Sequence, residues 1–600
     1  MCGITGIIHP RASRTLIESM TDVMNARGPD GSGYHVEPGL AMGMRRLSII
    51  DIEHGWQPFY SGEKAVVAFQ NGEIYNHREL REQLQSEGYV FNTESDSEVL
   101  AHGYHAWGIE ELARRLDGMY AIAILDREEQ ILFLIRDRFG EKPLFFTQSD
   151  SGFAYASDMR ILVSLHAKEL DLSLEGLNDY LALHYVPGRR TIIEGILRVL
   201  PGEIASVPLG TRTPVFSKYY RAPIGAQGPI SDDELAKIVE SAVESRMVAD
   251  VPVGVFLSGG LDSSIVASIA AKKNKEIATF SMGFKSAEHD ESEYAKILAE
   301  HIGSNHHHFT FDEQMFLDLL PKVAKSLDEP IGDQALLPVY WLCQEASKHV
   351  KVVLAGEAAD EIFAGYGYYS QFSAGKSIKD KVNSLLRGNK AVTSRLIQNT
   401  TPETPSGFPL LTDIVGRAGL IGAQGVIADD WERELLAWLK GASDPLQKAT
   451  CADLATWLPD DLLVKFDRMA MTHSLEGRAP FLDPKVVEAG IARLPSSERM
   501  FGKTSKVALR RISRRWLPEN ILERRKQGFV LPMKDWIDAW SRERGDVEGY
   551  FDNLPRFGAT LKLLGQQIEQ SIENDPSRER YHFAAIMLCE WAKAFVVEIE

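Results

Sequence analysis

The fold of the larger part of this chain is decided by residues 253–264, which read VGVFLSGGLDSS. The apolar residues over 253–257 predict a strand, the two glycines predict a tight turn, and a helical pattern follows over 262–272. Small residues at a helix start expose backbone N–H groups beside partial positive charge, so this turn favours an anion. It is not a Walker A loop, because Gly-Lys-Ser/Thr is missing at the required spacing. A tight turn with a Ser or Asp cap is the alternative.

Strands and helices alternate on both sides of this turn. A helical pattern covers 233–248, and further strands are expected over 276–283 and 351–355. This alternation predicts a parallel, doubly wound sheet of the α/β class. Because ligands bind at the carboxyl ends of parallel strands, the turn should lie near the loop GEAADE over 356–361.

Two carboxylates in these loops suit a metal ion. Asp262 in the first loop would repel a bare phosphate, which suggests that Mg²⁺ lies in between. Asp360 in the second loop follows a strand of the same expected sheet. Asp262 and Asp360 are therefore candidate ligands of one Mg²⁺–pyrophosphate, although both could also be helix caps.

The 600 residues exceed a single hydrophobic core, so two or more domains are expected. Residues 1–205 alternate short apolar strands, such as 65–70, 121–125 and 131–135, with glycine-rich turns. Residues 206–230 are rich in Pro and Gly and are interpreted as a linker, and 231–600 form the second domain. The tail from 451 is interpreted as helical.

The composition narrows the choice of partner and compartment. The chain is 44% hydrophobic and 25% charged, as in ordinary globular proteins, and its net charge of −18 argues against nucleic acid. Its four cysteines show no CxxC spacing, so neither a zinc site nor a disulfide framework is expected. It shows no run of eighteen apolar residues and no leader ahead of Cys2, so we expect a cytoplasmic protein without a membrane partner.

Cys2 follows the initiator in the opening run MCGITG. Once Met1 is removed, Cys2 carries both a thiol and a free α-amine, with ordinary pKa values of ~8.5 and ~7.7–8. The amine can then take the proton of the thiol, as in N-terminal nucleophiles. By position alone, an accidental cysteine in a disordered terminus would be the commoner case. We expect the active form to begin at Cys2.

Four clusters in the first hundred residues suit a small zwitterion: RGPDG over 27–31, RLSII over 46–50, NGEIYN over 71–76, and Ser95-Asp96. They combine guanidinium, carboxylate and amide groups with turn residues. Each also has a simpler interpretation. Asn71-Gly72 could be a common turn, Arg46 a surface charge, and Asp96 the N-cap of a helix over 97–104.

Together with Cys2, these clusters resemble, in order and separation, the glutaminase domain of N-terminal-nucleophile amidotransferases. The resemblance implies an α+β fold, a four-layer α/β/β/α sandwich, in which Cys2 attacks the side-chain amide of glutamine and releases ammonia through a glutamyl thioester. Arg46 would hold the α-carboxylate, Glu73 and Asp96 the α-amine, and Asn71 with the Gly72 N–H the oxyanion. The implied glutamine contacts also include Leu47, Ser48, Ile49 and Ile50.

The SGGLDSS turn resembles the pyrophosphate loop of enzymes that cleave ATP to AMP. Both halves in this order, with 356–361 and the run RAPFLD over 478–483, resemble the glutamine-hydrolysing asparagine synthetase family over nearly the whole chain. The resemblance implies that ATP adenylates the aspartate β-carboxylate and that ammonia, arriving through an internal tunnel, displaces AMP. The implied ATP contacts are Phe256, Leu257, Ser258, Gly259, Gly260, Asp262, Ser263, Ser264, Met282, Ala355 and Gly356.

Three further roles are carried over by the same resemblance. Lys526, in the basic run over 524–529, would stabilise pyrophosphate, although a solvated basic patch is an equal alternative. Glu357 would steer or deprotonate ammonia. Glu291 or Asp290 is a weaker candidate near the pyrophosphate.

The chain departs from the family's pattern Ser-Gly-Glu-Gly-Ala/Ser-Asp-Glu-x-Phe-Gly-Gly-Tyr, because it has alanine at 355, 358 and 364. The acceptor therefore stays open between aspartate and another carboxylate, as in a tailoring ligase of the same family. A third alternative is a glutaminase with a non-catalytic second half, against which the intact loop, Asp360 and Lys526 argue. The chain could act as a homodimer.

Two other segments receive structural interpretations. The charges within 458–469 alternate with apolar residues and are interpreted as buried ion pairs. The histidines at 306–308 are interpreted as the start of a strand rather than a metal site, because no Cys or carboxylate follows at ligand spacing.

Overall fold

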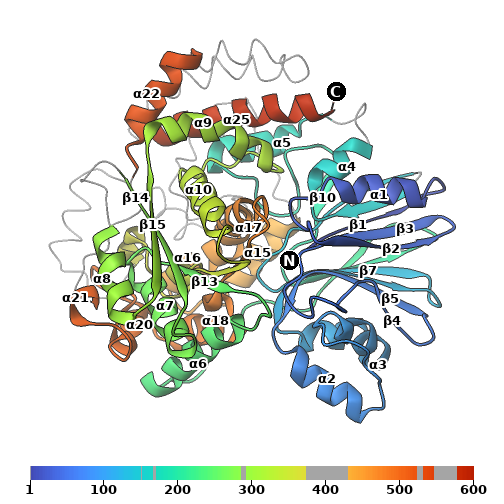
Figure 1. Cartoon of the computed structure of the whole chain (residues 1–600), viewed down its shortest axis with the longest axis horizontal. Coiled ribbons are helices and arrows are strands. Elements are labelled where there is room, and N and C mark those ends of the chain that lie inside the picture. The colour runs from blue at the N-terminus through green and yellow to red at the C-terminus, as the bar shows by residue number, and fades with distance from the viewer. Residues whose placement is uncertain are drawn as a thin grey trace.

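The computed structural model describes residues 2–150, 152–165, 171–284, 292–372, 430–522, 531–545 and 578–599. Figure 1 shows two parts, with the N-terminal strands on the right and the remainder of the chain on the left. Among the described residues, no helix is both long and apolar enough to span a membrane.

Two six-stranded antiparallel sheets form the first domain. The first has the order β10-β8-β9-β1-β3-β2 and the second β12-β11-β7-β6-β5-β4. The strands of the first sheet are β1 (Cys2–Ile8), β2 (Gly31–Glu37), β3 (Leu40–Arg46), β8 (Phe145–Ser149), β9 (Gly152–Ala156) and β10 (Ile196–Arg198). Those of the second are β4 (Phe59–Ser61), β5 (Val66–Ile74), β6 (Gly118–Asp126), β7 (Ile131–Arg136), β11 (Glu203–Pro208) and β12 (Val215–Lys218).

The sheets face each other through one apolar core and are covered by helices on their outer faces. Ile4 and Met42 of the first sheet pack with Phe69 and Ala121 of the second in this inner core. The outer helices of the first sheet are α1 (Arg14–Asp22), α4 (Met159–Leu165) and α5 (Leu174–Leu183), and those of the second are α2 (His77–Ser86) and α3 (Glu98–Arg115). The predicted four-layer α/β/β/α sandwich is confirmed.

The interpretation of 206–230 as a linker is wrong in its first half. β11 crosses the expected boundary at 205, and β12 pairs with it, with Glu203 opposite Lys218. Of the Gly and Pro residues in this segment, Gly210 and Pro214 lie in the turn between these two strands, where they interrupt an otherwise weak pattern. The first domain therefore extends beyond Lys218.

A five-stranded parallel sheet forms the centre of the second domain, in the order β15-β14-β13-β16-β17. Counted from β13, this is the order 3-2-1-4-5, so the direction of winding reverses between β13 and β16. The predicted doubly wound parallel sheet is confirmed. The strands are β13 (Val253–Phe256), β14 (Ala278–Phe284), β15 (Asn305–Phe311), β16 (Val352–Leu354) and β17 (Glu476–Arg478).

Helices flank this sheet, and a mostly helical segment follows it. The helices before residue 373 are α6 (Asp232–Arg246), α7 (Leu261–Lys273), α8 (Ser292–Ile302), α9 (Glu313–Ser326), α10 (Leu336–Ala346), α11 (Ala359–Ile362) and η1 (Gly367–Phe372). The later ones are α15 (Asp430–Leu439), α16 (Pro445–Ala455), η2 (Leu458–Leu462), α17 (Leu463–Met471), η3 (Pro480–Leu482), α18 (Pro484–Glu488), η4 (Ala489–Arg493), α19 (Ser496–Arg499), α20 (Val507–Ser513), α21 (Glu519–Leu522), α22 (Met533–Arg544) and α25 (Arg578–Ile599).

The tail is not entirely helical. β17 supplies an edge strand of the parallel sheet, and β18 (Met500–Phe501) pairs with β19 (Thr504–Ser505). The sequence of β17, Glu-Gly-Arg, has no strand-forming pattern, and it becomes a strand because β16 offers it an unpaired edge. This strand was missed because its residues carry no periodicity of their own.

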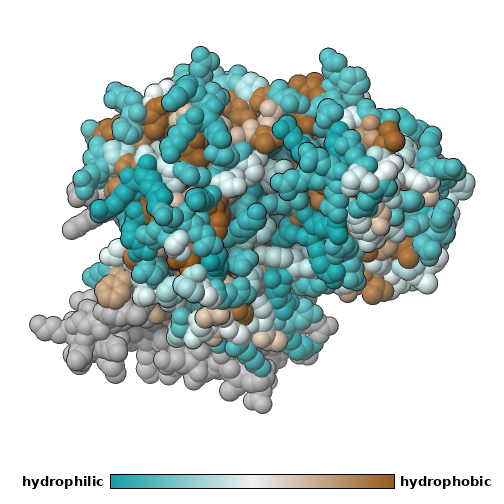
Figure 2. All heavy atoms as spheres, turned by 90° about the horizontal axis from the view of Figure 1, so that it is seen from below, coloured by the Kyte–Doolittle hydropathy of each residue, from teal (hydrophilic) through white to brown (hydrophobic). Residues whose placement is uncertain are grey.

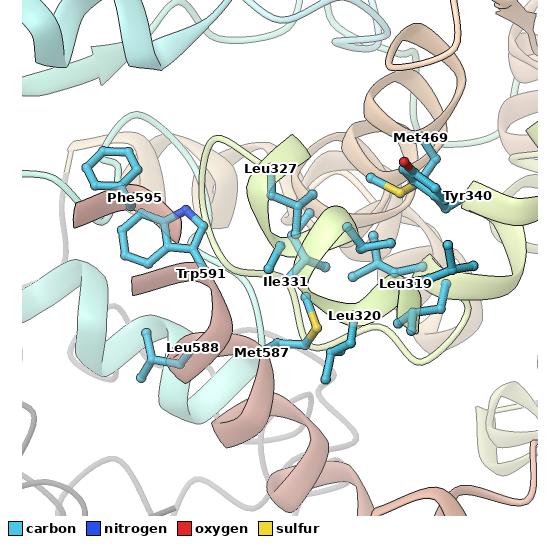
Figure 3. Close-up of a cluster of buried hydrophobic side chains, with 14 of the residues drawn as sticks. Leu319, Leu320, Leu327, Ile331, Tyr340, Met469, Met587, Leu588, Trp591 and Phe595 are labelled. Atoms are coloured by element: carbon cyan, nitrogen blue, oxygen red, sulfur yellow. The ribbon is translucent and has the colours of Figure 1, made fainter. Parts of the chain in front are cut away.

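The C-terminal helix joins the two domains. Trp591 and Met587 of α25 pack with Leu320 and Leu327 in one buried cluster (Figure 3). The Tyr180 hydroxyl of the first domain donates to the Ala584 carbonyl at 2.7 Å. Seen from below, the described surface is mostly hydrophilic, and its hydrophobic residues form small separate groups (Figure 2). α25 therefore contacts both domains through buried groups.

The ion pairs predicted within 458–469 are confirmed, and they lie between the domains. Asp467 of α17 binds Arg27 at 2.7 Å and Lys142 at 3.3 Å. Arg468 binds Asp158 at 3.1 Å. All five side chains are buried, so breaking one pair would leave a charge without its counter-ion.

Candidate active sites

Cys2 lies on β1, directly opposite Arg46 of β3. Its backbone nitrogen donates to Asn71 Oδ1 at 3.2 Å, and its carbonyl accepts from Arg27 Nε at 3.3 Å. Burial raises the pKa of the thiol, whereas the Leu47 N–H, which hydrogen-bonds to the sulfur, lowers it. Cys2 is thus held between the two sheets by its main chain, with its sulfur directed toward the loop after β3.

The two residues expected at the oxyanion both lie on β5, opposite β6. Asn71 donates through Nδ2 to Ser157 Oγ at 3.3 Å, which fixes the orientation of its amide. Gly72 has φ +152°, and a Cβ on it would lie 2.0 Å from the Met119 carbonyl oxygen. This position requires glycine, because any side chain would force β5 away from β6.

Two buried carboxylates stand next to this strand. Asp96 Oδ2 accepts from Gln70 Nε2 and from the Ile74 N–H, both at 2.9 Å. It is not the N-cap of α3, which is Ser97. Glu73 Oε1 is buried and has no hydrogen-bond partner among the described residues. Burial and Asp96 raise the pKa of Glu73, so a positive group placed between these carboxylates would be strongly favoured.

Arg46 is buried rather than a surface charge. Its Nη2 donates to the Asp51 carbonyl at 2.6 Å, its Nη1 donates to the Ile52 carbonyl at 3.1 Å, and its guanidinium covers the Trp56 ring at 4.8 Å. The intervening residues Leu47, Ser48, Ile49 and Ile50 form the loop that these bonds shape, and the Ser48 N–H donates to Asp30 at 2.8 Å. The predicted glutamine-binding residues therefore meet around Cys2.

The turn after β13 has the expected form. Ser258 Oγ and Ser263 Oγ lie 3.0 Å apart, and the Gly260 N–H donates to Ser258 Oγ at 3.3 Å. Gly259 has φ +70°, and a Cβ there would lie 2.7 Å from the Ala295 nitrogen of α8. Gly260 is the N-cap of α7, and the Ser264 hydroxyl is buried without a hydrogen-bond partner among the described residues.

The loop after β16 lies against this turn, at the point where the winding of the sheet reverses. A Cβ on Gly356 would lie 2.9 Å from Asp262 Cβ and 3.0 Å from the Ser263 nitrogen. The remaining residues expected at ATP line the same edge: Phe256 ends β13, the Leu257 N–H donates to the Phe280 carbonyl at 2.8 Å, Met282 lies in β14, and the Ala355 N–H donates to the Arg478 carbonyl at 3.0 Å.

Lys506 was not predicted, and it joins the two acidic loops. Its Nζ lies 2.5 Å from Asp262 Oδ2 and 2.8 Å from Asp360 Oδ1. Asp262 Oδ1 is buried and has no hydrogen-bond partner among the described residues. Two converging carboxylates, one with an unpaired oxygen, fit the oxygen ligands that Mg²⁺ prefers. In the sequence, Lys506 is marked only by the run GKTSK over 502–506. This run follows no strand of the parallel sheet, so its place in the chain did not indicate the ATP site.

Glu357 belongs to the same acidic group. Burial raises its pKa, as do Asp333, Asp360 and Asp262, whereas Lys465 lowers it. Lys465 is itself buried and contacts Asp333. A carboxylate with a raised pKa can accept a proton near neutral pH. Asp333 lies in the segment before α10, and Lys465 lies in α17. Sequence spacing alone could therefore not connect them with Glu357.

Some predictions lie outside the described residues. Lys526 and the rest of its basic run do, and so do Asp290 and Glu291. The three consecutive histidines lie within β15 itself, where His306 hydrogen-bonds to Thr279 and Ser281. Over the described ranges, no group of three or more His, Cys, Asp or Glu residues could hold a metal ion.

The departures from the family pattern have a backbone consequence. Ala358 has φ +71° and Ala364 has φ +54°, in the left-handed region that favours glycine. Both positions are glycine in the pattern stated above. This loop therefore accepts backbone strain of order 1–2 kcal/mol per alanine.

Comparisons with known proteins agree with the division of the chain into an amide-donor half and an ATP half. A glutamine amidotransferase domain model matches residues 1–220, and an asparagine synthase model matches residues 234–575. The chain belongs to the asparagine synthetase family. The boundary between the two models follows β12, in agreement with the extended first domain.

Two curated relatives of this family cover most of both chains. A putative glutamine-hydrolysing asparagine synthetase of Mycobacterium bovis is 36% identical over 90% of this chain and 89% of the relative. Asparagine synthetase 1 of Bacillus subtilis is 34% identical over 90% of this chain and 88% of the relative. Among solved structures, a glutamine phosphoribosylpyrophosphate amidotransferase of B. subtilis aligns over 52% of this chain and 81% of that one, at 16% identity and a TM-score of 0.30.

Proposed function

We propose that this protein is a glutamine-dependent asparagine synthetase, which releases ammonia from glutamine at Cys2 and uses it to amidate aspartate with ATP. The observation that supports this most directly is that a complete set of amide-donor groups and an adenylating loop occur in one chain. They are joined by the buried pairs of Asp467 and Arg468. The family of the chain and its full-length relatives support the same reaction.

Cys2 attacks the amide carbon of glutamine after its thiol gives up a proton to its own α-amine. The Cys2 nitrogen donates to Asn71 Oδ1 at 3.2 Å, and this bond holds the amine beside the sulfur. Asn71 Nδ2 and the Gly72 N–H stabilise the oxyanion, and one such donor contributes ~2.7–4 kcal/mol. Arg46 holds the α-carboxylate, while Glu73 and Asp96 hold the α-ammonium. Water then hydrolyses the thioester to glutamate.

At the second site, the Ser258–Ser264 turn holds the phosphates of ATP through its N–H and hydroxyl groups. Asp262 and Asp360 would hold Mg²⁺, which neutralises phosphate charge when bound. Lys506 must move from these carboxylates toward the phosphates when they are engaged. Lys526 is a further candidate cation for the pyrophosphate.

The aspartate β-carboxylate attacks the α-phosphate of ATP, forming aspartyl-AMP and pyrophosphate. Ammonia attacks this acyl carbon, AMP leaves with the bonding electrons, and the extra proton passes to Glu357. An internal path for ammonia is favoured because bulk water would protonate most of it at neutral pH. Phe256, Leu257, Met282, Ala355 and Gly356 would surround the nucleotide.

A pyrophosphate-release assay with glutamine, ATP, Mg²⁺ and a panel of carboxylates tests this function. Aspartate-dependent pyrophosphate and asparagine are expected. Release only with a different acid would instead assign a tailoring ligase, and glutamate without any pyrophosphate would assign a glutaminase. Omitting Mg²⁺ should abolish pyrophosphate release and leave glutamine hydrolysis intact.

We also propose that the enzyme works in the cytoplasm, without nucleic acid or membrane, and as a homodimer. The net charge of −18 supports the absence of nucleic acid, because phosphate backbones favour a basic surface. Light scattering of the purified chain tests the oligomeric state, for which a mass near twice that of the chain is expected.

A further inference from the structure

A side chain of the second domain binds one of the carboxylates of the amide-donor site. Arg478 ends β17, the edge strand of the parallel sheet, and it is fully buried. Its Nη2 lies 3.3 Å from Oε2 of Glu73 in the first domain. Its other nitrogens are also occupied, because Nε donates to Glu476 at 2.6 Å and Nη1 donates to the Arg246 carbonyl at 2.7 Å.

This arrangement leaves Glu73 in an unusual position for a structural ion pair. One carboxylate oxygen binds Arg478, whereas the other, Oε1, is buried with no hydrogen-bond partner among the described residues. A pair that served only to join the domains would be expected to satisfy both oxygens, since an unpaired buried acceptor is unfavourable. The unpaired Oε1 therefore indicates that this site binds a ligand with a hydrogen-bond donor.

Arg478 is also bonded to the parts of the second domain that approach both sites. Its Nη1 donates to the Val248 carbonyl at 2.7 Å, in the turn whose Asp250 N–H donates to the Ile49 carbonyl at 2.9 Å. Its own carbonyl accepts from the Ala355 N–H at 3.0 Å, and Gly356 then lies against Asp262. Arg478 thus contacts the amide-donor site through its side chain and the loop after β16 through its main-chain carbonyl.

We propose that Arg478 is a positioning residue of the amide-donor site: it binds one oxygen of Glu73 so that the other receives the α-ammonium of glutamine. Selection of the amino-acid substrate therefore depends on a residue of the synthetase domain. This inference rests on the proposed function, because it assumes that glutamine binds beside Cys2. Arg478 touches neither the amide nor the thiol.

The physical reason is the geometry of the guanidinium. Five N–H donors in a fixed plane can bind two carboxylates and two carbonyls at once, and a lysine has neither the number nor the directions. Arg478→Lys therefore keeps the positive charge and loses the orientation of Glu73. A matched control is Arg499→Lys, because Arg499 is equally buried in the second domain but bonds to Thr450 and Ser496.

The decisive measurement compares hydrolysis of glutamine with hydrolysis of glutaramate, which is glutamine without its α-amine. In the full-length chain, we expect Arg478→Lys to lower the kcat/KM preference for glutamine about tenfold, in the same direction as Glu73→Gln. The Arg499→Lys control should keep the preference within about twofold. Asparagine formation from added ammonia should stay within about threefold in Arg478→Lys, because the ATP site is retained.

An unchanged preference in Arg478→Lys, or an equal fall in Arg499→Lys, would overturn the inference. If Arg478→Lys does not fold, Glu476→Gln makes the same test, because it weakens the hydrogen bond that Arg478 Nε donates. A smaller fall in the preference for glutamine is then expected. No fall in this preference overturns the inference. Failure of the unaltered chain to hydrolyse glutamine overturns the proposed function as well, whereas an unchanged ratio overturns this inference alone.

Discussion

The candidate amide-donor site lies between two antiparallel sheets, whereas the candidate ATP site lies at the carboxyl ends of β13 and β16, which are inner strands of a parallel sheet. In the first, Asp96 accepts from the Ile74 N–H of β5 and Glu73 accepts from Arg478. These bonds fix the two carboxylates in positions that can receive a cation. In the second, the carboxylates of Asp262 and Asp360 are already bridged by Lys506. The first site is preorganised for a zwitterion, and the second must exchange an internal cation for its ligands.

The Cys2→Ala variant separates the two sites most sharply. We expect glutamine-dependent asparagine formation to fall by about 10³-fold or more, because the nucleophile is lost. Asparagine formation from added ammonia should be unchanged, since Cys2 lies on β1 of the first domain and the ATP loop lies in the second. An intact-mass measurement should show that the active chain begins at Cys2. Full glutaminase activity in a chain that retains Met1 would contradict the role of the α-amine.

Asn71→Ala tests whether the first site is preorganised. Loss of one oxyanion donor is expected to lower kcat for glutamine hydrolysis by about 10²–10³-fold. The KM for ammonia in synthesis should not change. A decrease of the same size in ammonia-driven synthesis would show that Asn71 acts on the whole interface instead of on the oxyanion.

Lys506→Met tests whether the second site depends on its bridging cation. We expect pyrophosphate release with either glutamine or ammonia to fall about 10²-fold, because a charge that balances phosphate is removed. Glutamine hydrolysis should persist. Lys503→Met is the control, since Lys503 is an exposed lysine in the turn between β18 and β19, three residues before Lys506. Equal losses in the two variants would point to a general effect on the turn.

The pH dependence of glutamine hydrolysis tests the charge state of the first site. Burial raises the pKa of the Cys2 thiol and that of Glu73, so low pH leaves both protonated. We therefore expect kcat/KM for glutamine, measured without ATP, to rise by up to about tenfold per pH unit until the α-amine is neutral near ~7.7–8. A profile that falls with pH over this range would contradict the assignment.

The smallest expected effect concerns the loop after β16. Ala358→Gly should raise the free energy of unfolding by about 0.5 kcal/mol, because relief of ~1–2 kcal/mol of left-handed strain outweighs one lost buried methyl of ~0.8 kcal/mol. Chemical denaturation measures this change. Ala359→Gly is a control without positive φ, and it should be destabilising.

The site residues that could be predicted are those carried by short local patterns. Asn71, Gly72 and Glu73 are consecutive on one strand, and residues 253–264 form one strand, turn and helix start. Their relative geometry follows from the chain itself. β12 and β17 were missed because each is short and irregular in sequence, and each becomes a strand only beside a neighbour that offers hydrogen bonds.

Lys506 and Arg478 could not be predicted for a different reason. Lys506 is separated from Asp262 by 244 residues along the chain, and Arg478 from Glu73 by 405. At such separations no spacing rule applies, and many other cations of the chain were equal candidates. Only burial in a shared core brings these groups within hydrogen-bond distance.

The sequence by itself determined the two chemistries, the candidate nucleophile, the candidate phosphate-binding turn and the classes of both sheets, because each depends on residues that are near one another in the chain. The tertiary structure alone decided which cation bridges the ATP-site carboxylates and which domain completes the amide-donor site. Those outcomes depend on the packing of distant segments, where charges are buried and must find a partner.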